Sequence, residues 1–462
     1  MKTRNLIKKI WGIMVILLSA NICSYLQNYS FAATDRTYIT LNDSKTTVNG
    51  EGAELTTSTN NGGTSTDAKS ANIEIDNVIN ITKAGTYEFT GTLSNGQISI
   101  NSNDINGEVV IILNDATITC KDAPAIFVYN KEVNSKKCTV TIKTAKGTTN
   151  TITGAKIKQS VEGWEDQDEI LYYIEKDTDD EGEYYERYKY DGAISSDVSL
   201  IFEGEGTLVV NSTEKEGIEG KGDITINSGN YQINSLDDGI NACTDNESDI
   251  TINGGTILVN VTSEAKEGDG IDSNNCLYIN GGYIYAFAAE SGTESGIDAD
   301  NGIYINGGYV VAIGRMADEV SSESKQNFLQ FNFRNRIKKD TLITITDKDD
   351  NPLVAFTSDR SYTALTISVP ELTGDEVNVY EGGTIEGEES NGLYTKISSY
   401  TKGTEKSYGS IDEKPAQPGQ RQQTSNNSNN DSSFEPYYIV LAVLVVLLII
   451  AIIVSVIVNK KQ

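Results

Sequence analysis

Ile226-Asn227-Ser228-Gly229 returns three times along the chain, as Ile252-Asn253-Gly254-Gly255, Ile279-Asn280-Gly281-Gly282 and Ile305-Asn306-Gly307-Gly308. The starts of these tetrapeptides lie 26, 27 and 26 residues apart. A second mark alternates with the first: Glu216-Gly217-Ile218-Glu219, Asp238-Gly239-Ile240-Asn241, Asp269-Gly270-Ile271-Asp272 and Ser295-Gly296-Ile297-Asp298. A fixed period of this length, filled with β-branched residues and glycines, is typical of a β solenoid.

Each repeat unit contains the pattern of three short strands. In Ile224-Thr225-Ile226 apolar and polar residues alternate, as in a strand with one buried face. The glycines that follow favour a tight corner, because glycine tolerates a positive φ. A second alternating run comes next, and the Gly-Ile mark supplies a third strand with one inward isoleucine. The sequence therefore predicts an all-β parallel β-helix whose coils stack at about 4.8 Å, with a strand-rich C-terminal cap from Phe328 onward.

The composition excludes several classes of partner and site. Acidic residues outnumber basic residues 66 to 37, which gives a formal net charge of −29. Such a surface repels nucleic acid and suits cations, so we expect no nucleic-acid partner. The chain has no histidine, which removes the commonest general base and most transition-metal sites.

The cysteines predict free thiols more strongly than a metal site. Cys120, Cys138, Cys243 and Cys276 show no CxxC spacing, which argues against zinc. Buried thiols are the first interpretation, and one disulfide is the alternative.

The two ends of the chain predict export and anchoring. Residues 1–33 have the basic start, the apolar run and the small residues of a secretory signal peptide. Residues 437–458 lack charge and are long enough for a transmembrane helix, and residues 459–462 would form a cytoplasmic tail. We therefore expect a single-pass protein of the cell membrane whose bulk is extracellular.

Two further segments interrupt or follow the predicted binding domain at residues 34–385. Residues 386–436 lead into a stretch rich in Pro, Gln, Ser and Asn and are expected to be a disordered linker. Residues 156–190 are rich in acidic residues and tyrosine and form a predicted insertion. This insertion is interpreted as a solvated excursion, with a ligand-facing flap as the alternative.

Several motifs in a shared order resemble a known family. They are Lys83-Ala84-Gly85-Thr86-Tyr87-Glu88-Phe89-Thr90-Gly91-Thr92-Leu93, Ala125-Ile126-Phe127-Val128, Asp191-Gly192-Ala193-Ile194-Ser195-Ser196, the repeats, and Asp347-Lys348-Asp349-Asp350-Asn351-Pro352. Over about residues 37–383 the chain resembles secreted clostridial carbohydrate-binding β-helix proteins, which are related in fold to pectate lyases. The resemblance implies a right-handed parallel β-helix, bound calcium, and binding of cellulosic or pectic polysaccharide of the plant cell wall.

The outward residues of the third strand predict a calcium site. The residue after the inward isoleucine is Glu219, Asn241, Asp272 and Asp298 in successive units. Carboxylates stacked at about 4.8 Å repel by a few kcal/mol at an effective dielectric near 20. A bound Ca²⁺ would turn this repulsion into attraction. The predicted metal ligands are Asp238, Asp269, Asp272, Asp298 and Asp300. The alternative is that they are solvated turn residues.

Tyrosines collect at outward positions of the last two units. The candidate carbohydrate-binding residues are Tyr278, Tyr283, Tyr285, Tyr304 and Tyr309. Sugar rings pack their C–H faces on aromatic rings, and exposed aromatic clusters are uncommon unless something binds them. The alternative is that the segment from Phe328 onward folds back over these rings.

These features together favour a cell-surface protein that binds extracellular polysaccharide without catalysis and with the help of calcium. The first alternative is a calcium-dependent polysaccharide lyase, which would need a basic residue beside the metal. In the repeat, none of the few lysines and arginines stands in register beside an outward acid. The second alternative is an adhesin or structural surface protein.

Overall fold

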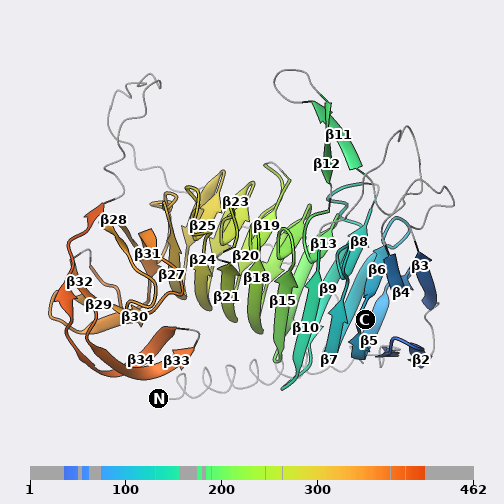
Figure 1. Ribbon diagram of the computed structural model, residues 1–462, viewed down its shortest axis with the longest axis horizontal. Helices are drawn as coiled ribbons and strands as arrows, with labels where there is room; N and C mark the ends of the chain where they lie inside the picture. The colour runs from blue at the N-terminus through green and yellow to red at the C-terminus, as the bar shows by residue number, and fades with distance from the viewer. Residues whose placement is uncertain are drawn as a thin grey trace, which may run out of the picture. The chain divides into compact units, whose positions relative to one another are not determined.

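The computed structural model describes residues 36–49, 55–61, 74–130, 132–155, 174–178, 184–188, 190–244, 246–262, 264–374, 376–390 and 392–410. All of them lie within one compact unit, Met1–Glu413. Every regular element in this part of the chain is a β-strand (Figure 1).

The strands form four sheets. The largest has 19 strands: β1 (Arg36–Leu41), β2 (Thr47–Asn49), β5 (Gly85–Leu93), β7 (Gly107–Thr119), β9 (Cys138–Thr144), β10 (Thr149–Gly154), β14 (Leu200–Gly204), β15 (Thr207–Ser212), β17 (Ile224–Ile226), β18 (Asn230–Ser235), β20 (Ile250–Ile252), β21 (Thr256–Val261), β23 (Cys276–Ile279), β24 (Tyr283–Phe287), β26 (Gly302–Ile305), β27 (Tyr309–Gly314), β28 (Leu329–Ile337), β31 (Tyr362–Ser368) and β36 (Gly409–Ser410). The second has nine strands: β3 (Leu55–Asn61), β4 (Glu74–Ile81), β6 (Gly96–Asn101), β8 (Ile126–Tyr129), β13 (Ile194–Ser196), β16 (Ile218–Gly220), β19 (Ile240–Ala242), β22 (Ile271–Ser273) and β25 (Ile297–Ala299).

The two remaining sheets are smaller and antiparallel. One has six strands: β29 (Ile343–Asp347), β30 (Pro352–Phe356), β32 (Val377–Glu381), β33 (Thr384–Ser390), β34 (Leu393–Thr401) and β35 (Thr404–Glu405). The other is the pair β11 (Ile174–Thr178) and β12 (Tyr184–Tyr188), which lies in the predicted insertion.

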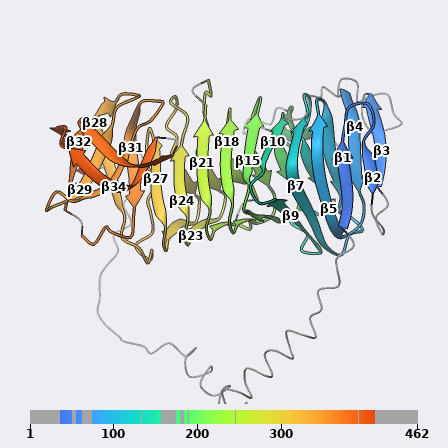
Figure 2. The same cartoon turned by 90° about the horizontal axis from the view of Figure 1, so that it is seen from below.

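Each repeat unit gives two strands to the 19-stranded sheet and one to the nine-stranded sheet. Each strand pairs in parallel with the strand one unit further along, so that Ile224 faces Ile250, Ile250 faces Leu277 and Leu277 faces Ile303. In Figure 2, β15, β18, β21, β24 and β27 lie side by side in this order. Because the period keeps equivalent residues in register, the inward isoleucines and valines join one continuous buried core.

The second glycine of the Gly-Gly corner is required by its conformation and by its neighbour. Gly282 has a φ of 97°, and a Cβ atom there would lie 2.8 Å from the carbonyl oxygen of Gly255. Gly308 repeats the geometry against Gly282. Consecutive corners thus approach too closely for any side chain.

A second core lies where the repeat ends. β27 pairs antiparallel with β31, which also pairs with β28. The buried residues here include Tyr285 and Phe287 from the repeat and Phe331 and Phe356 from the closing strands. We call residues 328–410 the closing segment.

The fold class predicted from the sequence is wrong as stated. It combined a right-handed parallel β-helix and a strand-rich cap with a transmembrane helix. The described residues contain no helix, so no helix among them could cross a membrane. They form four sheets in which antiparallel pairs such as β1–β2 and β27–β31 adjoin the parallel ones. The antiparallel pairs involve strands outside the repeat, where no period predicts the pairing. The fold is all-β with both kinds of pairing.

Other boundary predictions meet the structure only in part. Residues 1–33, 437–458 and 459–462 lie outside the described residues. Strands β33 to β36 fall within or across the start of the predicted linker at 386–436, because residues 384–401 form an antiparallel pair with a register shift between Glu386 and Glu388. Cys120, Cys138, Cys243 and Cys276 are all free thiols, of which the first two are buried.

Candidate functional site

Strands β16, β19, β22 and β25 place the Gly-Ile marks in strict register, with Ile218, Ile240, Ile271 and Ile297 facing one another. The flanking residues therefore form two columns with a spacing of about 4.8 Å. We call the carboxylate and amide members of these columns the acid file: Glu216, Glu219, Asp238, Asn241, Asp269, Asp272 and Asp298.

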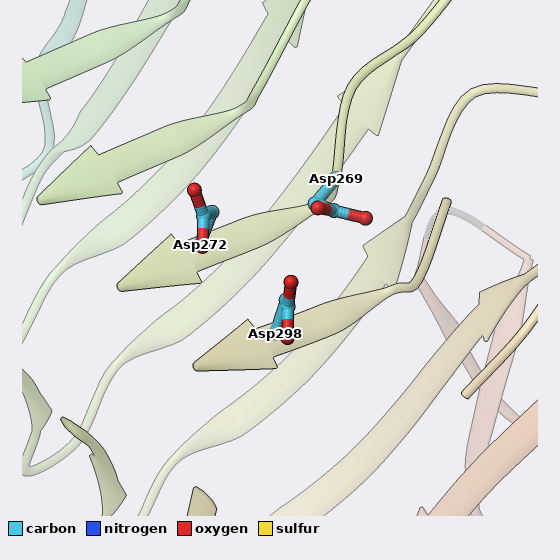
Figure 3. A group of neighbouring side chains, drawn as sticks. All are labelled: Asp269, Asp272 and Asp298. Atoms are coloured by element: carbon cyan, nitrogen blue, oxygen red, sulfur yellow. The ribbon is translucent and has the colours of Figure 1, made fainter. Parts of the chain in front are cut away.

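Three carboxylates of the acid file converge at its C-terminal end. Asp269, Asp272 and Asp298 each offer an oxygen, and these oxygens all lie within 4.8 Å of one another (Figure 3). The backbone N–H of Ser295 donates to Asp269 at 2.5 Å, and that of Ala299 donates to Asp298 at 2.7 Å. The three residues form what we call the aspartate triad, and all are half-buried.

The electrostatics of the aspartate triad suit a cation. Burial, together with the nearby carboxylates of Asp238 and Asp298, raises the pKa of Asp269 to about 9. Burial, followed by the same two neighbours, raises the pKa of Asp272 to about 8. The raised pKa values show that these carboxyl groups ionise with difficulty when no cation is near. A hard divalent ion such as Ca²⁺ would relieve this by binding their oxygens.

The other two predicted metal ligands lie outside the triad. Asp238 sits one unit away and accepts hydrogen bonds from the backbone N–H of Asp269 at 2.7 Å and from Asn241 Nδ2 at 2.8 Å. Burial and the neighbouring Asp237 raise the pKa of Asp238 to about 7. Asp300 is exposed, so the structure brings together three of the five predicted residues.

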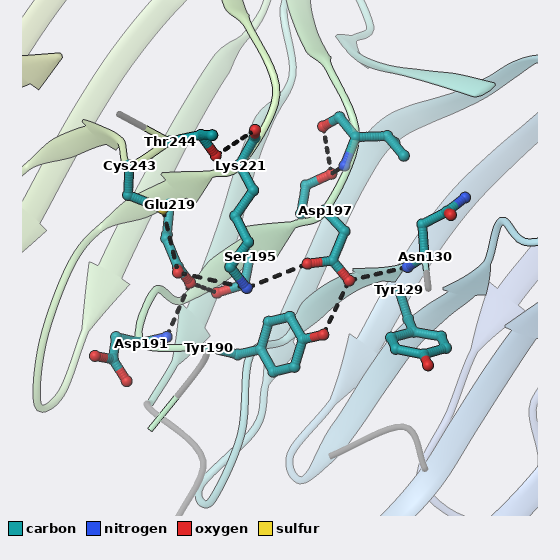
Figure 4. Close-up of polar contacts among 12 residues, drawn as sticks. Tyr129, Asn130, Tyr190, Asp191, Ser195, Asp197, Glu219, Lys221, Cys243 and Thr244 are labelled. Atoms are coloured by element: carbon teal, nitrogen blue, oxygen red, sulfur yellow. Dashed lines mark hydrogen bonds and ion pairs between the residues drawn. The ribbon is translucent and has the colours of Figure 1, made fainter. Parts of the chain in front are cut away.

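A lysine lies at the N-terminal end of the acid file, so the expectation that no lysine of the repeat stands beside an outward acid is wrong for Lys221 and Glu219. Lys221 Nζ lies 3.1 Å from Asp197 Oδ1 and 3.9 Å from Glu219 Oε1, and 3.8 Å above the Tyr190 ring (Figure 4). Glu219 also accepts hydrogen bonds from Ser195 Oγ at 2.7 Å. Lys221 has no equivalent in the later units, so no periodic signal marks it.

Four tyrosines form two stacked pairs on the 19-stranded sheet. Tyr278 and Tyr304, on β23 and β26, stack with ring centroids 5.1 Å apart. Tyr283 and Tyr309, on β24 and β27, stack at 4.9 Å. Tyr283 is 38% exposed, and the hydroxyl of Tyr309 donates to Glu371 Oε1 at 2.6 Å. Within each pair the ring faces lie against each other, and the two pairs stand on either side of the Gly-Gly corner in sequence.

Tyr285 does not belong to this surface. It is 3% exposed and packs against Phe287 and Phe356, and its hydroxyl donates to the carbonyl oxygen of Thr357. The closing segment buries Tyr285 and partly covers Tyr309, so the alternative that the sequence left open holds fully for Tyr285 and in part for Tyr309.

A ladder of asparagines between the tyrosine pairs was not predicted from the sequence. Nδ2 of Asn253, Asn280 and Asn306 each donates to the Oδ1 of the asparagine one unit earlier at 2.9 Å, beginning at Asn227. Each internal amide retains one N–H and one lone pair outside the ladder. The signal was present, because asparagine is the second residue of every repeated tetrapeptide.

Comparison with known proteins places this arrangement in a family. One solved structure is similar, the polysaccharide lyase-like protein from C. thermocellum in its gadolinium derivative, with 23% identity, a TM-score of 0.38, and coverage of 59% of this chain and 89% of that one. None of the curated proteins matches. The family model described as a carbohydrate-binding domain-containing protein matches residues 75–359, which include every repeat unit. The expected family is thereby confirmed: the chain belongs to the carbohydrate-binding domain-containing proteins.

Proposed function

We propose that the chain binds extracellular polysaccharide without catalysis, on the two tyrosine pairs, and that Ca²⁺ in the aspartate triad supports the binding domain. The observation that carries this proposal is the stacking of four partly exposed tyrosines in a member of a carbohydrate-binding family. The chain would act outside the cell, where such polymers lie.

The tyrosine pairs and the asparagine ladder complement each other chemically. Aromatic rings accept the C–H faces of sugars, and the spare amide groups can exchange hydrogen bonds with sugar hydroxyls. In the third and fourth units, Tyr278, Asn280 and Tyr283 occur in this order along the chain, and Tyr304, Asn306 and Tyr309 repeat it. A polymer lying along the repeat axis would meet the same set of groups twice.

Calcium would stabilise the repeat instead of bridging to the polymer. In the aspartate triad, Asp272 lies on β22, Asp298 lies on β25, and Asp269 lies two residues before β22, at the nine-stranded sheet. The tyrosines belong to strands of the 19-stranded sheet. This separation favours an uncharged polysaccharide at the tyrosines, since an anionic one would face an acidic protein without a bridging cation.

The lysines near the acid file do not favour a lyase. Burial lowers the pKa of Lys221, but Glu219 and Asp197 more than reverse this, so the ammonium form is favoured. Lys215 is likewise paired with Asp237, and its pKa is raised. A protonated lysine cannot remove a proton from a sugar ring.

Removing one exposed tyrosine pair is expected to weaken polysaccharide binding at least about tenfold, or 1.4 kcal/mol. The double change Tyr283→Ala and Tyr309→Ala removes the pair, and isothermal titration calorimetry against soluble glucans measures the affinity. Tyr38→Ala is the matched control, because Tyr38 is 50% exposed on β1 and belongs to neither pair. Unchanged binding in the double variant would refute the tyrosine site, and unsaturated sugar products would refute the non-catalytic function.

A calcium concentration 100 times the dissociation constant is expected to raise the free energy of unfolding by about 2.7 kcal/mol. The thermal midpoint should rise with it. Asp272→Asn should abolish most of this gain, and Asp300→Asn should retain it, because Asp300 lies outside the triad. Without calcium, acids with a raised folded-state pKa favour the protonated form, so stability is lost as pH rises from about 3.8 through about 9. The gain from calcium should therefore be larger at pH 8 than at pH 5; equal gains would contradict the site.

A further inference from the structure

Lys221 and Asp197 form a buried ion pair just past the ends of two adjacent parallel strands. Asp197 follows β13 and Lys221 follows β16, and these strands pair with Ser196 facing Gly220. Lys221 Nζ lies 3.1 Å from Asp197 Oδ1. Asp197 is 0% exposed and Lys221 is 8% exposed. Both charges have lost most of their water, so a neutral product at this place would escape the desolvation penalty that the pair carries.

Two hydrogen-bond donors hold the other oxygen of the Asp197 carboxylate. The backbone N–H of Asn130 and the hydroxyl of Tyr190 each donate to Oδ2 at 2.9 Å (Figure 4). If a nucleophile added to Cγ of Asp197, the negative charge would fall on this oxygen, where both donors already point. This is the arrangement of an oxyanion hole, which stabilises the tetrahedral intermediate of acyl transfer.

A second carboxylate lies beside the amine. Glu219 Oε1 is 3.9 Å from Lys221 Nζ. The other oxygen of Glu219, Oε2, accepts hydrogen bonds from Ser195 Oγ at 2.7 Å and from the backbone N–H of Asp191 at 2.9 Å. Oε1 lies on the side of the lysine, where the thiol of Cys243, a weak donor, is 3.7 Å away. A carboxylate held in this way can carry a proton between the amine and a leaving oxygen.

Aromatic rings shield the pair from water. Lys221 Nζ lies 3.8 Å from the centre of the Tyr190 ring, and this ring packs edge-on against Phe127 with centroids 4.7 Å apart. Both rings are buried. A site that excludes water favours a reaction that releases water and protects its product from hydrolysis.

We propose that Lys221 and Asp197 condense into an intramolecular amide bond, with Glu219 as the proton carrier. Asp197 Oδ1 first takes a proton from the ammonium group through their hydrogen bond. The neutral amine then attacks Cγ, which forms the C–N bond and places the negative charge on Oδ2. Glu219 removes a second proton from the nitrogen and delivers it to Oδ1, which leaves as water when the bond between Cγ and Oδ1 breaks. One ammonium and one carboxylate thus become one amide and one water, and no co-reactant is needed.

The bond forms slowly and then locks two neighbouring strands together. Because burial lowers the pKa of Lys221 less than Glu219 and Asp197 raise it, the neutral amine is scarce. Until the bond forms, the two residues keep their ion pair and its charges. The bond joins positions 24 residues apart. It therefore ties β13, the first strand after the predicted insertion at 156–190, to β16 by a link that unfolding does not break.

Intact-mass spectrometry of the denatured full chain, followed by peptide mapping, tests the bond. After prolonged incubation at neutral pH, the mass of the unaltered protein is expected to lie one water below the mass calculated for its sequence. Mapping is expected to recover Lys221 and Asp197 in one linked pair of peptides. No chelator or polysaccharide should change this result, because neither calcium nor a sugar takes part in the reaction.

Three variants assign the roles. Lys221→Arg should keep its full mass, because a guanidinium stays protonated. Glu219→Gln should also keep its full mass, because the amide has nearly the same shape but cannot carry the proton. Lys215→Arg is the matched control and should still lose one water, because Lys215 pairs with Asp237 outside this site. Circular dichroism verifies that each variant is folded, and Glu219→Gln carries the test if Lys221→Arg does not fold.

The outcomes decide both the bond and its mechanism. The full calculated mass in the unaltered protein overturns the proposal. A missing water that persists in Lys221→Arg, or that maps to other residues, overturns it as well. A bond that forms equally fast in Glu219→Gln overturns the role assigned to Glu219. A linked pair of peptides found in the unaltered protein and in Lys215→Arg alone establishes the bond and the proton carrier.

Discussion

Replacing Arg360 with methionine is expected to lower the free energy of unfolding by about 3 to 5 kcal/mol. Arg360 is 1% exposed, in the connection between β30 and β31. Its guanidinium donates to the carbonyl oxygens of Val261 and Ala288, the latter at 2.9 Å, and to Asn260 Oδ1. Methionine keeps much of the volume but leaves these buried acceptors without a donor.

Arg360 matters because it joins two parts of the chain. Val261 ends β21 and Ala288 follows β24, so both acceptors belong to the repeat, whereas the arginine belongs to the closing segment. The guanidinium also lies 5.0 Å from the centre of the Phe287 ring. Its loss should therefore loosen the closing segment at the second core, where Tyr285 and Phe356 meet.

Urea unfolding followed by tyrosine fluorescence measures the effect, with Arg336→Met as the control. Arg336 lies on β28 in the same closing segment, and its side chain is 44% exposed beside Glu290. Exposed ion pairs contribute about 0 to 1 kcal/mol, so the control should change little. Equal losses in both variants would show that the buried contacts of Arg360 contribute nothing special.

The repeat made much of this structure predictable, because a fixed period implies both the register and the inward residues. Ile226, Ile252, Ile279 and Ile305 are buried as expected, and Asp269, Asp272 and Asp298 converge because the same register stacks them. A residue that recurs at one position of every unit can be placed without a structure. This holds for the asparagine ladder as well, which the sequence displays but which was not recognised.

The predictions that failed concern residues whose contacts do not recur from one unit to the next. Tyr285 alternates outward in β24 like Tyr283, yet residues about 70 positions further along the chain cover it. A lysine stands beside the acid file in one unit only, and its partner Asp197 lies 24 residues earlier in the chain. Strands β33 to β36 escaped prediction because their polar composition resembles that of the linker that follows. Single long-range contacts leave no periodic trace in a sequence.

Lys221→Met is expected to destabilise the fold by about 3 to 5 kcal/mol at pH 7, because it leaves two buried carboxylates without their cation. Asp197 is fully buried and keeps its hydrogen bonds from the Asn130 N–H and the Tyr190 hydroxyl, both at 2.9 Å. These donors do not cancel its charge. Chemical unfolding measures the loss, and Lys136→Met is the control, since Lys136 forms an exposed pair with Asp223 at 3.0 Å and should cost at most about 1 kcal/mol.

The pH dependence distinguishes lost charge from lost packing in Lys221→Met. In the unaltered protein the pKa of Lys221 is raised, so its contribution is complete below about 10.5 and is lost only as pH rises beyond that value. In the variant, a proton bound in the folded state can replace the missing ammonium, so the variant regains stability as pH falls. The difference between the two proteins should therefore shrink from pH 8 to pH 5. A difference that stays constant over this range would mean that the methylene chain of Lys221, and not its charge, stabilises this end of the acid file.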